Sequence, residues 1–118
     1  MTNTEPFRID SGNEWEYQYQ IGGISISPRR LKEIFGKPVP NPGEPEKITG
    51  EYIFIATSGS RYSIHDWRST NLSEGDNTPS PEEFWNISEP YELSIGGDEP
   101  VNLAELESFR DWLIKKCA

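Results

Sequence analysis

The chain has 118 residues, a net charge of −9 and one cysteine, Cys117. This length fits a single domain over residues 1–118, and a lone cysteine excludes an internal disulfide. No run approaches the ~20 apolar residues of a membrane helix, and the N-terminus lacks the features of a signal peptide, so we expect a cytoplasmic protein.

The N-terminal part predicts a strand followed by a helix. Residues 14–21 alternate aromatic or aliphatic with polar side chains, which is typical of a half-buried strand. Gly22-Gly23 follows, either as a bulge or as a turn into a short second strand over residues 24–26. Ser27, Pro28 and Gly36 then suit the cap, the first turn and the end of a helix.

The remainder predicts a hairpin, a short helix, a strand and a final helix. The hairpin turns at residues 58–60, and the short helix begins with the capping-box pair Ser80 and Glu83. We expect a strand over residues 91–97, with Tyr91 inward, and an amphipathic helix after Asn102 that buries Leu103. The order is one or two strands, helix, strand, strand, helix, strand, helix. It predicts an α+β fold in which a small, mostly antiparallel sheet carries the C-terminal helix on one face.

Acidic charge is concentrated in residues 74–111. This segment holds eleven acids and one base, a charge of −10, while the other nine acids and ten bases sum to +1. Such a surface disfavours nucleic acid and suits a basic protein partner, although solubility alone is the simpler explanation. Phe84 and Trp85 add a candidate apolar patch beside the acids. The candidate partner-binding residues are Glu82, Glu83, Phe84, Asp98 and Glu99.

Residues 61–70, RYSIHDWRST, contain the only histidine. Ser63 and His65 point to one strand face and Asp66 to the other, which excludes a local catalytic triad and leaves only distant partners. A half-exposed strand histidine is the simpler expectation. One histidine and one cysteine supply few tools for catalysis or metal binding, so we expect no enzyme, no catalytic residue, no metal and no cofactor.

Trp67 and Arg68 are the best candidates for binding a small ligand. An indole offers a stacking face, and a guanidinium offers a planar fork for carboxylate or phosphate. Arg29 and Arg61 would join them if the first helix lies near the hairpin. Core packing is the favoured alternative for Trp67, and we also expect Trp85 and Trp112 in the core.

Three short motifs between residues 31 and 113 resemble those of a loose group of small, mostly uncharacterised bacteriophage proteins. They are Phe35-Gly36-Lys37-Pro38, Ser63-Ile64-His65-Asp66-Trp67-Arg68 and Leu93-Ser94-Ile95-Gly96-Gly97. The chain departs from that group's pattern with His for the usual Tyr, Arg for Lys, and Leu for the usual Trp. The resemblance implies a phage origin and therefore the cytoplasm of a host cell, but no mechanism.

These observations lead to two expectations and one simpler alternative. The first is a non-catalytic phage-type counter-defence protein whose acidic face binds and inhibits a host defence protein. The second is a sponge that sequesters a nucleotide-like immune signal at Trp67 and the arginines. The third is a structural or regulatory phage protein. None of the three involves a membrane or direct binding to nucleic acid, and all leave the oligomeric state open.

Overall fold

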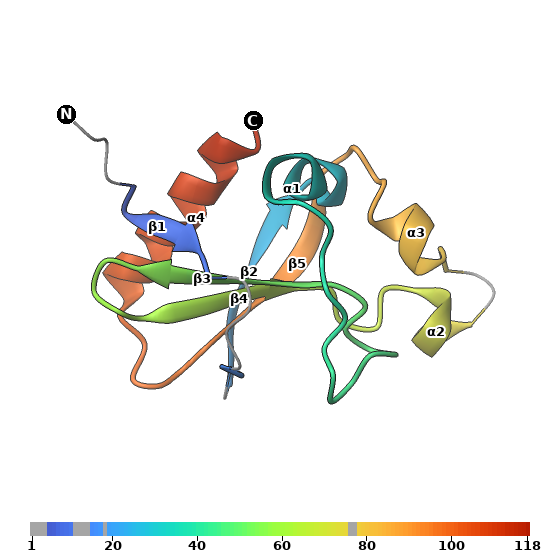
Figure 1. The fold of residues 1–118 in the computed structure, drawn as a ribbon, viewed down its shortest axis with the longest axis horizontal. Helices are drawn as coiled ribbons and strands as arrows, with labels where there is room; N and C mark the ends of the chain where they lie inside the picture. Colours follow the sequence, from blue (N-terminus) through green and yellow to red (C-terminus); the bar gives the residue numbers. More distant parts are fainter. Residues whose placement is uncertain (1–4, 11–14, 18, 76–77) are drawn as a thin grey trace.

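The computed structural model describes residues 5–10, 15–17, 19–75 and 78–118. Its elements are β1 (Phe7–Ile9), β2 (Tyr19–Ile26), α1 (Pro28–Phe35), β3 (Glu51–Ala56), β4 (Arg61–His65), α2 (Asn71–Glu74), α3 (Pro81–Phe84), β5 (Tyr91–Gly97) and α4 (Leu103–Lys116). The strands form one antiparallel sheet in the order β1-β3-β4-β5-β2. α1 and α4 lie on one side of it, and the connection from α1 to β3 descends to the other (Figure 1). The predicted α+β class is confirmed.

Local capping signals place the first and third helices where the sequence predicts them. The Ser27 side chain accepts a hydrogen bond from the backbone of Arg30, and Gly36 ends α1 with a φ of 90° that favours glycine. Ser80 and Glu83 form both hydrogen bonds of a capping box at α3. These bonds satisfy backbone N–H groups that a helix start otherwise leaves free.

The C-terminal helix begins as predicted but buries a narrower face. The Asn102 side chain accepts from the backbone N–H of Glu105. The Glu105 carboxylate does not complete the cap, because it accepts from the hydroxyls of Ser58 and Tyr62 and ties α4 to the hairpin. Leu103, expected in the core, is 72% exposed because it lies in the first turn, before the face that meets the sheet.

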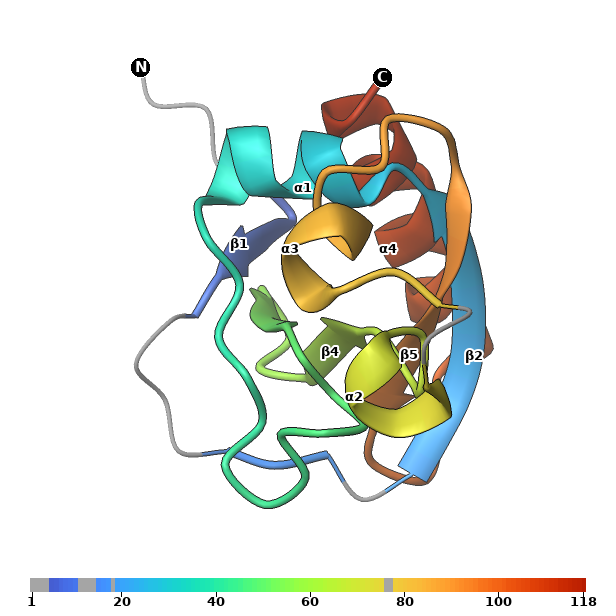
Figure 2. The ribbon, with the colours of Figure 1, turned by 90° about the vertical axis from the view of Figure 1, so that its right-hand side faces the viewer.

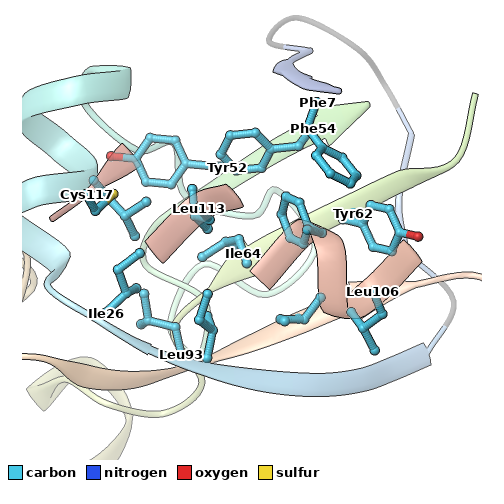
Figure 3. Packing of buried hydrophobic residues seen from close by; sticks show 14 of the residues in the cluster. Phe7, Ile26, Tyr52, Phe54, Tyr62, Ile64, Leu93, Leu106, Leu113 and Cys117 are labelled. Carbon is cyan, nitrogen blue, oxygen red and sulfur yellow. The ribbon is translucent and has the colours of Figure 1, made fainter. Parts of the chain in front are cut away.

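The core lies between the sheet and α4, with α1 and α3 closing its edge. Phe109 of α4 stacks on Tyr62 of β4, with ring centroids 4.9 Å apart, and contacts Phe54 of β3 at 5.4 Å. Figure 3 shows the labelled side chains of the strands and α4 pointing into this one layer. Trp85 is buried and Trp112 packs against the cluster, as expected. Tyr91, expected inward, is partly exposed at the start of β5.

Three local features differ from the sequence-based prediction. β2 is one continuous strand with a bulge near Gly22, so the bulge alternative is correct. Of the strand predicted over residues 14–21, residues 15–17 lie outside β2, and residues 14 and 18 lie outside the described residues. β1 and α2 were not predicted, because they have only three and four residues, too few for a periodic pattern to emerge.

Within the described residues, no helix is long and apolar enough to cross a membrane.

Candidate functional site

The sheet face turned away from α4 carries a buried chain of polar side chains. Ser63 Oγ donates to Glu51 Oε2 at 2.7 Å, and His65 Nδ1 lies 2.8 Å from the same Ser63 oxygen. Asn41 Nδ2 donates to Glu51 Oε1 at 3.3 Å. Because the single proton of Ser63 is directed to Glu51, its oxygen accepts from His65, which therefore carries a proton on Nδ1.

Tyr17 covers this chain from outside the sheet. Its ring stacks on the His65 imidazole, with centroids 4.6 Å apart and an angle of 16° between the planes. The neighbouring strand supplies Gly96, where a Cβ would collide with the Tyr17 ring. The result is that His65 is 1% exposed and Ser63 is fully buried, so the expectation of a half-exposed histidine is wrong.

Burial sets the protonation of this chain. It lowers the pKa of His65 to about 4, so the imidazole is neutral at pH 7. It also raises the pKa of Glu51, against the opposing effect of the hydrogen bonds from Ser63 and Asn41. In a catalytic triad the histidine lies between serine and acid, and the serine faces substrate. Here the serine lies between His65 and Glu51 and is buried, an arrangement that stabilises the sheet and exposes no nucleophile.

Asp66 belongs to a second buried chain, which joins the end of β4 to the segment before β3 and to Trp85 at the end of α3. Its carboxylate accepts from Thr49 Oγ1 at 2.6 Å and from the backbone N–H of Gly50 at 3.0 Å. Trp85 Nε1 in turn donates to Thr49 Oγ1 at 3.1 Å. Burial raises the pKa of Asp66, while these hydrogen bonds act in the opposite direction. Asp66 therefore holds structure together on the side away from His65.

Trp67 lies at the surface and is flanked by two cations. Its side chain is 41% exposed, so the favoured expectation of core packing is wrong. Lys47 Nζ and Arg68 Cζ each lie 5.7 Å from the centroid of the indole, within cation–π range. The backbone N–H of Arg68 donates to the carbonyl of Lys47 at 2.8 Å, which fixes the two segments side by side. Lys47 was not predicted from the sequence, because a loop rather than a helix or strand with a periodic pattern brings it to the indole of Trp67.

The other two arginines do not join this surface. Arg61 lies at the opposite end of β4, a five-residue strand that is ~17 Å long. It forms an ion pair with Asp10 at 2.9 Å. Arg29 lies on α1 and pairs with Glu33 at 3.8 Å. A clamp built from all the candidate arginines is therefore not formed, and the cations at Trp67 are Arg68 and Lys47.

Phe84 does not lie on a surface. It is 0% exposed, and its ring contacts Trp85 and Tyr91 edge-on, with centroids 5.2 and 5.0 Å away. The apolar patch expected from Phe84 and Trp85 is therefore wrong, because both rings, at the end of the short α3 helix, are buried in the core. Phe84 is removed from the residues available to a partner.

The two candidate acid pairs are exposed but lie apart. Glu82 and Glu83 belong to α3, which packs against the start of β5, and Figure 2 shows α3 at this end of the molecule. Asp98 and Glu99 follow the other end of β5. A strand of seven residues is ~20 Å long, so the acids form two clusters separated by β5.

Among the described residues, no three His, Cys, Asp or Glu side chains lie together as a metal site requires. No protein-family model matches the chain, and no curated protein matches it closely enough to indicate a family. The assignment of a function therefore rests on the geometry above.

Proposed function

We propose that the protein is a non-catalytic, phage-type counter-defence protein that binds and inhibits a component of a host antiviral system. The observation that carries this proposal is the contrast between interior and surface. The residues suited to catalysis, Ser63, His65 and Glu51, are engaged in internal hydrogen bonds, whereas the four candidate acids are exposed. The phage origin rests on the motif resemblance.

Both acid clusters can contact one partner. A stable interface buries about 800 Å² on each protein, a patch on the order of 30 Å across. The ~20 Å between the two ends of β5 fits within such a patch. A basic host surface that spans β5 would meet both clusters, and the exposed charges would speed its association at low salt.

Reversing the charge of Glu82, Asp98 and Glu99 to lysine should abolish inhibition, because like charges would then face each other in the complex. Glu83 is changed to glutamine to preserve the capping box. Phage growth on bacteria that carry the defence system measures inhibition, and circular dichroism checks the fold.

The matched control reverses three exposed acids outside the acidic segment, Glu16, Glu44 and Glu46, and should leave inhibition intact. Full inhibition by the folded Glu82, Asp98 and Glu99 variant would exclude docking through these clusters. Equal losses of inhibition in both variants would show that inhibition depends on the net charge of the protein rather than on a particular surface.

The exposed indole at Trp67 favours a second candidate function, the sequestration of a nucleotide-like signal. A base would stack on the Trp67 ring while Lys47 and Arg68 neutralise phosphate. This site lies outside the acid clusters named above, so their negative charge does not exclude an anionic ligand.

For this second function, Trp67→Ala should weaken binding by roughly 1–3 kcal/mol, the usual contribution of one stacked base. Arg68→Gly removes the guanidinium and suits the φ of 53° at this position. Tyr19→Ala, another exposed aromatic, is the control. Calorimetric titration with cyclic and linear nucleotides measures affinity. Unchanged affinity in folded Trp67→Ala would rule out a stacking site here.

A further inference from the structure

A groove of about 600 Å³ lies between the α1–β3 connection and α3. Figure 2 shows these two segments facing each other below α1. Pro38 and Pro40 line one wall, Pro81 lines the other, and the edge of Trp85 contributes to the floor. This volume falls within the ~300–1,000 Å³ of small-molecule sites.

The groove is built from rigid parts. Proline rings fix the backbone of both walls. Trp85 is held by the hydrogen bond to Thr49, which is in turn held by Asp66. A Cβ on Gly50 would lie 2.6 Å from the Trp85 ring, so only glycine allows the ring this close. A preformed groove loses little conformational entropy when a ligand binds.

Two lysines give the groove a local positive charge in an acidic protein. Lys32 of α1 and Lys37 of the following loop both line it. Lys32 donates to the Asn86 side chain, and within the described residues neither lysine has an acidic partner within 4 Å. The one acid on the lining is Glu82, on the α3 side.

We propose that this groove binds a small organic anion, with its carboxylate, sulfonate or phosphate at Lys32 and Lys37 and its apolar body along the proline walls. Charge complementarity selects an anion, because a cation would meet two ammonium groups against one carboxylate. The apolar surface of the prolines selects an organic body over an inorganic ion. The stacking face of Trp85 is covered by Gly50, so the body lies along the groove and does not stack on the indole. This site is separate from the Trp67 surface and from Asp98 and Glu99.

Fluorescence titration with anilinonaphthalene sulfonate tests the proposal, since this probe joins an apolar aryl body to one anionic group. The probe should bind saturably to the folded protein. Changing both Lys32 and Lys37 to glutamine should weaken binding at least about tenfold, equivalent to ~1.4 kcal/mol. Phenylnaphthylamine, its uncharged analogue, should bind more weakly than the sulfonate and equally to both proteins.

The matched control changes two other exposed bases, Arg8 and Lys115, to glutamine and should leave binding unchanged. Asn86→Trp places an indole in the groove and should abolish binding while circular dichroism stays native. Equal losses in the two double variants, or full binding by folded Asn86→Trp, would overturn the proposal. The same holds if no saturable binding occurs below ~1 mM. These variants leave Asp98 and Glu99 intact, so failure here is distinguishable from failure of the acidic docking surface.

Discussion

Asp66→Ala should lower the free energy of unfolding by about 3 kcal/mol, because it leaves buried donors without an acceptor. The Thr49 hydroxyl and the Gly50 amide both lose their bond to the carboxylate. Each buried group left unpaired costs about 1–3 kcal/mol. Urea unfolding monitored by circular dichroism measures the loss.

Asp66→Asn is the matched control, because it retains one acceptor oxygen in the same place. It should recover roughly half of the lost free energy of unfolding, because one of the two buried donors regains an acceptor. A loss below about 1 kcal/mol in Asp66→Ala would show that water replaces the carboxylate and that the chain to Trp85 contributes little. The experiment also bears on the groove, since its floor depends on the same chain.

Elements with local signals were predictable from the sequence. The caps of α1, α3 and α4 depend on residues within one turn, and the hairpin turn depends on Gly59, which has a φ of 95°. β1 is a three-residue strand whose existence depends on pairing with β3, so no local pattern indicates it. The confirmed α+β class follows from elements long enough to show their period.

The buried chain around His65 was partly within reach of sequence reasoning. A hairpin with its turn at residues 58–60 would place Ile53 opposite His65, whereas the observed register is two residues different and places Glu51 there. A difference of two residues keeps the same sheet face, so the sequence places Glu51 on the face of His65 as a diagonal neighbour, and only the observed register makes it the directly opposite residue. The missing signal was Tyr17, whose ring buries the group from a segment outside the sheet.

The Trp67 surface and the two acid clusters depend on features of the fold that a pattern along the sequence does not indicate. Trp67 is exposed because β4 ends at His65 and Arg68 takes a positive φ, so alternation no longer applies. Lys47 reaches the indole through a proline-rich loop. Residues 74–111 read as one charged stretch, yet the length of β5 separates the candidate acids Glu82 and Glu83 from Asp98 and Glu99.

Stability should fall by about 3 kcal/mol through His65 as the pH drops from 7 to 4. Burial lowers the folded-state pKa of His65 from 6.5 to about 4. Between these values the unfolded chain binds a proton that the folded protein excludes, so unfolding is favoured as the pH falls. The stabilising contribution is complete above pH 6.5 and is lost toward pH 4, at about 1.4 kcal/mol per pH unit.

Glu51 opposes this trend, and His65→Gln separates the two effects. Because burial raises the pKa of Glu51, its contribution to stability is greatest at low pH and is lost as the pH rises above 4.5. Glutamine keeps a donor for Ser63 without titrating. Urea unfolding of both proteins at a series of pH values gives the difference between their stability curves. Because His65 is the only histidine, that difference should shrink by up to about 3 kcal/mol between pH 7 and pH 4. Parallel curves would mean that the imidazole is protonated in the folded state, which requires Tyr17 to leave its stack and admit water.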